Sequence, residues 1–533
     1  MEINMTTNSA QLKQFHQILL WPLRLLVPDN KEQNAVIGEL TKKNWAETTI
    51  SKNYAEQVYF HPFIRQFLYG DADTPATVQV YERCDVNKIK VTLKSMDNPS
   101  FTLDVKRIQL YLFEVGIGIL VVEVSSQAIE NIKDIEDFLD QFRRAYPPYW
   151  DEWGAGHSPK SVEFFSKDNQ SLVVSNFEKV DYFQQDVIEK KNFPVAAHWE
   201  YLLQPLVRYT GKNENSDKIR YQQVGDERIP YMAHLAFDDP HLLTRGDFIR
   251  LALADESENS DSFPYAEPFL KDFEERYCYD RYWENDDGVD KKKKWLTTRY
   301  LCCGYAFTMT GNYMKVNEDT NVKEPDFFIN AEVGALSHFR RHYFMMGLIA
   351  HFHKAALLVL WDKLAKAVAK FTKKEASRRE FKKEVHDILE ELLHFTHRYW
   401  FTELSNQVQP KELFDWWSHH LGTRELFDRV MKEAQDAHQF LEMEEQKQQT
   451  DITIRLTVVA TIGLAIGLVL GFFGGNYNVA EKFTHLTSLF ASWSNWKWTL
   501  ILTGFSFIFM MIVLFFSTPI ARFMGWIASF WKK

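Results

Sequence analysis

The chain has 533 residues, of which 45% are hydrophobic and 25% are charged. This composition is typical of folded globular proteins and excludes a wholly disordered chain. The formal net charge of −10 argues against a nucleic-acid-binding protein that works through bulk basicity. Four cysteines exclude a disulfide scaffold, and at about 150 residues per domain the length predicts three or four structural units.

The N-terminal part contains one short apolar run, from Phe15 to Pro28. Pro22 and Arg24 interrupt this run, and no basic region precedes it, so it does not have the pattern of a signal peptide. We expect a helical N-terminus in which this run is a buried helix or an interfacial segment.

A series of strands is predicted between Thr77 and Ala128. Five β-rich runs bounded by turn residues support it: VQVYERC, KIKVTLK, FTLDVK, IQLYLFEV and GILVVEVSS. Gly116 and Gly118 lie between the last two runs. Because no helix start follows them, this GxG pattern favours a hairpin turn over a phosphate-binding loop.

The remainder of the N-terminal region mixes helical and strand patterns. An amphipathic helix is predicted from Asn131 to Ala145, and further strands near Leu172–Ser175, Ile229–Phe237 and Trp295–Met309. Residues 1–327 are therefore expected to form an α+β (α/β) cytoplasmic domain.

Two charged segments of this region, DESENSDS at 255–262 and ENDDGVDKKKK at 284–294, are interpreted as solvated loops. A weak divalent-cation site in the second loop is the alternative, with the carboxylates of Asp286, Asp287 and Asp290.

The chain becomes helical from residue 328. Long helical patterns at Ile329–Phe371 and Lys374–Leu404 predict antiparallel cytoplasmic helices over residues 328–408. A stalk helix is predicted over 409–452. No proline interrupts Thr423–Phe473, so one helix of about 75 Å would run through this stretch at 1.5 Å per residue.

The predicted stalk carries a seam with heptad spacing, apolar or small in its first half and polar in its second. Two interpretations remain open: a hydrated axis shared by several copies, or a helix packed on its own domain. The seam consists of Phe427, Val430, Ala434, Ala437, Leu441, Glu444, Gln448, Asp451 and Arg455.

Two membrane-spanning helices are predicted near the C-terminus, at residues 453–473 and 498–517. Each has about the 20 apolar residues that a bilayer core requires. Residues 474–497 would form an outer loop and 518–533 a basic cytoplasmic tail. Basic residues flank the segments on the side of both termini, which predicts a multi-pass protein of the inner (plasma) membrane with both termini in the cytoplasm.

The first membrane segment has a pattern of small and weakly polar residues. Gly463, Gly467 and Gly471 recur every four residues, which permits close helix–helix approach. A threonine stripe, Thr450, Thr453, Thr457 and Thr461, follows similar steps. Because threonine can bond to its own helix backbone, the stripe indicates a pore only through its continuity with the stalk seam.

These features resemble the CorA family of divalent metal ion (Mg²⁺/Co²⁺/Zn²⁺) transporters. The match covers Leu456–Ile462, similar to the family's LTxxATI stretch, and Gly471–Tyr477. The family's Gly-Met-Asn motif falls on Gly474, Gly475 and Asn476, so the chain resembles a divergent member of the family with Gly-Gly-Asn in its place. The resemblance implies a funnel-shaped homopentamer whose first membrane helix lines a pore.

The resemblance also implies the site residues. Asn476 would place a ring of amide oxygens at the outer mouth, suited to hydrated Mg²⁺. Leu456 and Leu464 would form apolar constrictions. The implied pore-lining positions are Thr450, Thr453, Leu456, Ala460, Leu464, Gly467 and Gly471.

Passive transport of divalent cations such as Mg²⁺ is therefore the expected function. The predicted partners are further copies of the chain, the lipid bilayer and divalent cations, with a divalent cation as transported or regulatory ion, no other cofactor and no nucleic acid. The alternative is a ligand-gated CorA-like effector or sensor with altered selectivity or no metal transport.

Enzyme motifs are absent from the sequence: it contains no P-loop, GxSxG, CxxC pair or HExxH. A non-enzyme is therefore expected. His338 and His342, spaced i, i+4 and followed by His351 and His353, are a minor zinc hypothesis beside the interpretation as ordinary helix histidines.

Overall fold

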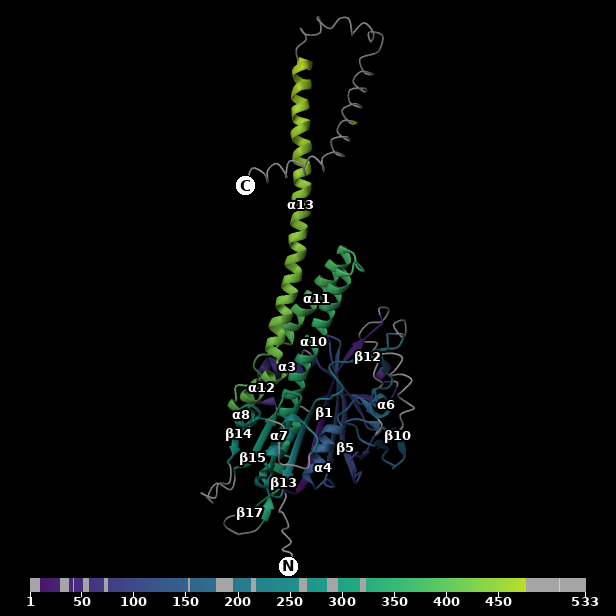
Figure 1. The fold of residues 1–533 in the computed structure, drawn as a ribbon, viewed down its shortest axis with the longest axis vertical. Coiled ribbons are helices and arrows are strands. Elements are labelled where there is room, and N and C mark those ends of the chain that lie inside the picture. The colour runs from purple at the N-terminus through teal and green to yellow at the C-terminus, as the bar shows by residue number, and fades with distance from the viewer. Residues whose placement is uncertain are drawn as a thin grey trace, which may run out of the picture. The chain divides into compact units, whose positions relative to one another are not determined.

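The structure is a computed structural model (Figure 1). It describes residues 10–28, 38–41, 43–50, 57–70, 75–151, 154–178, 195–211, 217–257, 266–284, 296–316, 323–475 and 508. The chain divides into two compact units, Met1–Lys432 and Glu433–Lys533.

A mixed sheet organises the first unit. Within the described residues it has 14 strands, in the order β10-β9-β4-β5-β6-β1-β13-β16-β15-β14, with β2–β3 paired to β5 and β11–β12 to β1. Neighbours along the main path are antiparallel except β13 and β16. The strand pairs β7–β8 and β17–β18 form two separate two-stranded sheets. The strands of all three sheets are β1 Leu12–Leu26, β2 Trp45–Thr48, β3 Gln79–Arg83, β4 Lys88–Thr92, β5 Ser100–Phe113, β6 Ile117–Ser126, β7 Trp150–Asp151, β8 Gly154–Ala155, β9 Ser161–Phe165, β10 Ser171–Asn176, β11 Val207–Arg208, β12 Arg220–Gln223, β13 Tyr231–Phe237, β14 Cys278–Trp283, β15 Thr297–Cys302, β16 Ala306–Asn312, β17 Met314–Val316 and β18 Lys323–Pro325.

Helices follow and flank these strands. The α-helices are α3 Pro62–Tyr69, α4 Ile132–Gln141, α6 Ala197–Leu203, α7 Arg245–Leu253, α8 Glu267–Tyr277, α9 Ala335–His338, α10 Phe344–Thr372, α11 Arg378–Arg398, α12 Val408–Leu421 and α13 Thr423–Gly475. Short 3₁₀ turns lie at Pro240–Leu242 and Phe327–Ile329, and a π-helical turn, η4, lies at Phe339–Tyr343.

Helices cover both faces of the sheet (Figure 1). On one face α10 packs through Phe352, whose ring stacks on Phe113 of β5 at a centroid distance of 3.9 Å, and α12 packs through Trp417 on β16. On the other face Phe138 of α4 meets Phe15 of β1 at 5.3 Å, and α6 and α7 complete that layer. The predicted sheet-rich domain followed by helices is therefore present.

The expectation of a helical N-terminus is wrong, because Phe15–Pro28 falls largely in β1, an inner strand of the sheet. Both faces of β1 are covered, so its apolar residues run continuously and lack the alternation of a half-exposed strand. Pro22 fits because it lies where β1 changes partner, between the stretch paired with β13 and the stretch paired with β12. Its missing N–H therefore removes no regular ladder bond.

The other strand predictions of this region are confirmed. The five runs between Thr77 and Ala128 form β3 to β6, with the third and fourth runs joined in β5 through an irregularity between Val105 and Arg107. Gly116 has a φ of +73° in the turn between β5 and β6, so the GxG pattern belongs to a hairpin. The predicted helix after Asn131 is α4, and Asn131 caps it by accepting a hydrogen bond from the Lys133 N–H.

The region after 328 is helical, as expected. The helices α10 and α11 pack on each other, and the capping box of Ser377 and Glu380 starts α11. Among the described residues, one helical stretch, Ala335–Thr372, is long and apolar enough to cross a membrane. Most of its apolar window is buried inside the protein, as in a core helix of a soluble domain.

The predicted 409–452 stalk is divided in the structure. The helix α12 ends at Leu421 and is capped by Gly422, which has a left-handed φ of +61°, and α13 begins at Thr423. From there α13 continues for 53 residues to Gly475, so the expectation of an uninterrupted helix over Thr423–Phe473 is confirmed. At 1.5 Å per residue it is about 80 Å long.

Candidate functional site

The residues implied as pore-lining all belong to α13. Their steps of three and four residues place them along one face of a helix. The structure describes the surroundings of six of them, and all six are exposed in the single chain: Thr450, Thr453, Leu456, Ala460, Leu464 and Gly467. Gly471 also belongs to α13, but its exposure is not among the features that the structure describes.

Large apolar side chains of α13 are also exposed, and they point in several directions around the helix. Leu456 is 61% and Leu464 66% exposed, while Ile452 and Ile454 are exposed by 56% and 43%. At 100° per residue these four positions are spread over more than one face. One partner helix on one side would therefore leave part of this apolar surface uncovered.

Two glycines of α13 have free space around them. Apart from its own helix backbone, a Cβ atom built on Gly463 or Gly467 would meet no atom of the described residues within 4 Å. Nothing in the described part of the chain therefore requires a glycine at either position. Glycine at this spacing is typical of helices that approach another helix closely.

The threonine stripe bonds to its own helix. The hydroxyl groups of Thr450, Thr457 and Thr461 each donate a hydrogen bond to the carbonyl four residues earlier, at 2.7–2.8 Å. This back-bonding satisfies the hydroxyl proton without a partner. The hydroxyl oxygen retains acceptor capacity for water or a cation.

The motif at the end of the first predicted membrane segment is only partly described. Gly474 and Gly475 are the last residues of α13. Asn476 lies outside the described residues, as do the outer loop, the tail and, apart from Ile508, the second predicted membrane segment.

The first half of the heptad seam packs on the chain's own domain. Phe427 stacks on Trp400 with ring centroids 4.5 Å apart, and Val430 is fully buried. The interpretation of a helix packed on its own domain therefore holds here. Further along, Gln448, Asp451 and Arg455 are exposed.

The zinc hypothesis for the helix histidines gains no support. His338 and His342 lie together, and His342 stacks on Tyr59 at 4.0 Å. His351 instead packs edge-on against Trp417, and His353 lies 2.6 Å from a backbone carbonyl. Burial lowers the pKa of all four histidines. The other metal alternative, Asp286, Asp287 and Asp290, lies outside the described residues.

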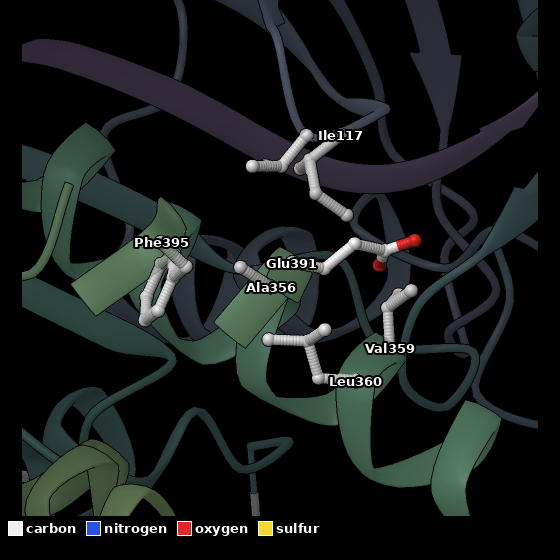
Figure 2. Close-up of a pocket in the computed structure, with 7 residues that line it drawn as sticks. Ile117, Ala356, Val359, Leu360, Glu391 and Phe395 are labelled. Atoms are coloured by element: carbon white, nitrogen blue, oxygen red, sulfur yellow. The ribbon is translucent and has the colours of Figure 1, made fainter. Parts of the chain in front are cut away.

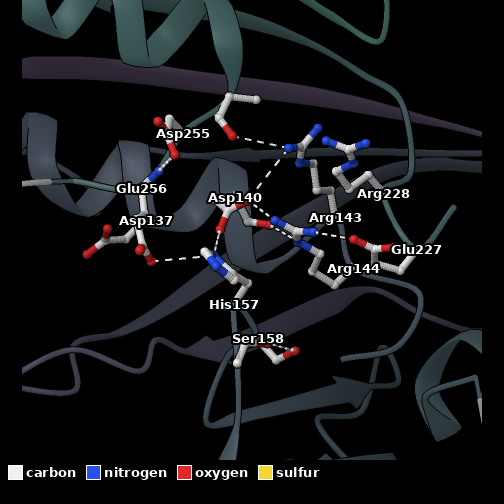
Figure 3. A network of polar contacts seen from close by, with 12 residues as sticks. Asp137, Asp140, Arg143, Arg144, His157, Ser158, Glu227, Arg228, Asp255 and Glu256 are labelled. Atoms are coloured by element: carbon white, nitrogen blue, oxygen red, sulfur yellow. Dashed lines mark hydrogen bonds and ion pairs between the residues drawn. The ribbon is translucent and has the colours of Figure 1, made fainter. Parts of the chain in front are cut away.

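A polar network at the C-terminal end of α4 contains the one group of three potential metal ligands found among the described residues (Figure 3). It consists of Asp140, His157 and Glu256. The Nδ1 atom of His157 lies 2.9 Å from Asp140 Oδ2 and 3.5 Å from Glu256 Oε2. Arg144 bonds to the other oxygen of Asp140 at 2.5 Å and to Glu227 at 2.8 Å.

The electrostatics of this network follow from its geometry. Burial alone would raise the pKa of Asp140, but the hydrogen bond with His157 and the charge of Arg144 lower it. The hydrogen bond with Asp140 raises the pKa of His157. Burial raises the pKa of Glu256, and the charges of Asp140 and Asp137 raise it further, against the opposing charge of His157.

A small apolar pocket lies between the β5–β6 turn and helices α10 and α11 (Figure 2). It is lined by Val115, Ile117, Ala356, Val359, Leu360, Glu391 and Phe395. Its one charged side chain, Glu391, is held by Lys363 at 2.5 and 2.7 Å. The pocket therefore offers apolar packing space and no free reactive group.

Sequence reasoning pointed to residues of α13 and gave no sign that Asp140, His157 and Glu256 come together. These three residues come from separate segments: α4, the loop after β8 and the loop after α7. No local spacing signals such a group, and the segment with Glu256 has the composition of a solvated loop. Comparisons with protein-family models, with curated proteins and with solved structures find no match to this chain.

Proposed function

We propose that this chain is a CorA-like membrane protein that assembles with further copies into a pore for divalent cations, with α13 lining the pore. The observation that carries the proposal is α13 itself. An unbroken helix of 53 residues leads from the folded domain into a stretch where large apolar side chains are exposed on more than one face of the helix.

Exposed apolar area supports a membrane location for this stretch. Each large apolar side chain left in water forgoes about 1.5–3 kcal/mol of burial free energy. Lipid covers such a helix from every direction, whereas one neighbouring helix covers one side. Ile452, Ile454, Leu456 and Leu464 therefore fit a helix surrounded partly by lipid and partly by other copies.

The glycines support contact with other copies. Gly463 and Gly467 have open space around them among the described residues, and residues without side chains let two helix backbones approach. In the proposed homopentamer these glycines would allow neighbouring α13 helices to pack closely around the axis.

The polar groups of α13 support an aqueous path at its start. Thr450 and Thr453 are exposed on the same face as Leu456. Hydroxyl oxygens accept hydrogen bonds from hydrated cations, and the leucines further along would gate by dewetting. Asn476 would complete the path with amide oxygens suited to hydrated Mg²⁺, in a membrane topology that leaves both termini in the cytoplasm.

Ion flux into liposomes that contain the purified protein tests this function. Mg²⁺, Co²⁺, Zn²⁺, Na⁺ and Cl⁻ are compared, and we expect divalent flux that Asn476→Ala abolishes. A matched pair tests the pore face: in Ala460→Cys a water-soluble thiol reagent should block flux, whereas in Val458→Cys, about 160° away around the helix, it should not.

The outcomes separate the two candidate functions. Divalent flux with selective block at position 460 supports the pore. Block at both positions, or at 458 alone, contradicts the assignment of the pore face. Absence of flux for every ion in a well-formed oligomer contradicts transport and favours the ligand-gated effector or sensor.

A further inference from the structure

We propose that Asp140, His157 and Glu256 form a binding site for one divalent transition-metal ion of the Zn²⁺ class. The site lies within the first unit and is independent of the proposed pore. It offers one imidazole nitrogen and two carboxylate oxygens, a donor set that suits Zn²⁺, Co²⁺ and Mn²⁺ better than Mg²⁺.

The spacing of the donor atoms supports the site. Around a tetrahedral Zn²⁺ with ligand bonds of about 2.1 Å, neighbouring donor atoms are roughly 3.4 Å apart. His157 Nδ1 lies 3.5 Å from Glu256 Oε2 and 2.9 Å from Asp140 Oδ2, and all three donor atoms lie within 4.8 Å of one another. To admit the ion, the separation of His157 Nδ1 and Asp140 Oδ2 would lengthen by about half an ångström.

The surrounding residues hold the buried ligand in position. The side chain of Asp140 is 3% exposed, and its Oδ1 accepts a hydrogen bond from Arg144 while Arg143 lies 3.6 Å away. Arg144 is fixed in turn by Glu227. This arrangement leaves Oδ2 facing His157, and hydrogen bonds that orient a ligating carboxylate are typical of metal sites.

Access from solvent also favours a cation. The side chain of Glu256 is 50% exposed and that of His157 29%, which gives the ion a path from solvent and leaves a fourth position for water.

Metal binding to the full-length protein tests the proposal. The protein is stripped with chelator in detergent, and Zn²⁺ is titrated by calorimetry with excess Mg²⁺ present. We expect one Zn²⁺ per chain with a Kd on the order of 1 µM. Bound Co²⁺ should give the visible absorption of a four-coordinate site.

Substitutions locate the site. His157→Ala and Glu256→Gln should each weaken Zn²⁺ binding at least ~10-fold and reduce the Co²⁺ absorption. His438→Ala is the matched control, because His438 is an exposed histidine beside one carboxylate, Glu442. Glu256→Gln changes a half-exposed side chain and should leave thermal unfolding of the stripped protein unchanged.

Two results would overturn the proposal. One is the absence of Zn²⁺ binding by the wild-type protein. The other is binding that persists unchanged in both His157→Ala and Glu256→Gln, which would place the ion elsewhere. Neither result depends on ion flux, so failure of this site and failure of the proposed pore remain distinguishable.

Discussion

Arg340, in the π-helical turn before α10, forms an ion pair with Glu123, a residue in the middle of strand β6 whose side chain has no solvent exposure. The same carboxylate pairs with Arg107 at 2.6 Å. The guanidinium group of Arg107 also lies over the ring of Phe344 at 4.0 Å. The start of α10 is therefore attached to the sheet through one buried carboxylate shared by two arginines.

We expect Arg340→Leu to destabilise the protein by about 1–3 kcal/mol, because it removes one of the two partners of a buried carboxylate. The remaining ion pair with Arg107 keeps the loss below that of an isolated buried charge. Chemical unfolding of the full chain in detergent measures the change. The control is Arg276→Leu, which breaks an exposed ion pair with Asp272 and should cost less than about 1 kcal/mol.

Glu136 of α4 predicts a dependence of stability on pH. Its side chain is buried, and burial together with the charge of Asp247, partly offset by Arg250, raises its pKa from 4.5 to about 9. The folded protein therefore favours the protonated acid. This stabilising contribution is fully present below pH 4.5 and is lost as the pH rises towards 9.

Glu136→Gln should therefore flatten the pH dependence of thermal unfolding between pH 5 and 9. The variant should be more stable than the wild type at pH 8, because glutamine carries no charge to bury. Glu390→Gln, on an exposed position of α11, is the control and should keep the wild-type profile. A wild-type profile in Glu136→Gln would show that Glu136 does not titrate in this way.

Gly347 of α10 allows a close approach to α12. A Cβ atom on Gly347 would lie 2.5 Å from the indole ring of Trp417. Trp417 has little room to move, because its Nε1 donates to the Gly304 carbonyl at 2.8 Å and its ring stacks on Phe307. Alanine would favour the helix by about 1 kcal/mol, but overpacking costs about 1–3 kcal/mol.

Gly347→Ala should therefore lower the free energy of unfolding in spite of its better helix propensity. Adding Trp417→Phe removes the atoms that clash, so the alanine should cost less in the Trp417→Phe background than in the wild type. A double-mutant cycle measures this difference. Equal costs in both backgrounds would contradict the predicted clash.

Gly467→Leu tests the proposed contact between copies of α13. Because Gly467 has open space around it in the part of the chain that the structure describes, we expect unfolding of the domain to be unchanged. Assembly should weaken at least about tenfold, since a leucine side chain would separate neighbouring backbones. Light scattering in detergent across a dilution series measures assembly, with Ile454→Leu as the control. An unchanged dissociation profile would place Gly467 outside the interface.

The half-exposed strands were predictable from the sequence because their residues alternate. In β4 the buried residues Ile89 and Val91 alternate with less buried lysines, and the hairpin at Gly116 follows from its turn residues. The continuous α13 was predictable because no proline interrupts it. The break at Gly422 was missed, although a glycine in a left-handed conformation is a common helix end.

Other features depended on contacts that the sequence does not display. Strand β1 was mistaken for a helix because both of its faces are covered, by α10 on one side and by α4 and α6 on the other. The group of Asp140, His157 and Glu256 requires three segments separated by up to 116 positions to meet. The predicted pore face, in contrast, needs only the spacing within one helix.

Because α13 is continuous, it behaves as a stiff rod that carries a movement at one end to the other end. A helix without a break resists bending, so a small rotation at Thr423 is enlarged with distance along its axis. For a rod of about 80 Å, a tilt of only about 5° at one end displaces the other by roughly 7 Å, more than the roughly 4.2 Å between opposite oxygens around a hydrated Mg²⁺. In the proposed pore, a change in how Phe427 rests on Trp400 would therefore be enough, by geometry alone, to alter the width of the passage.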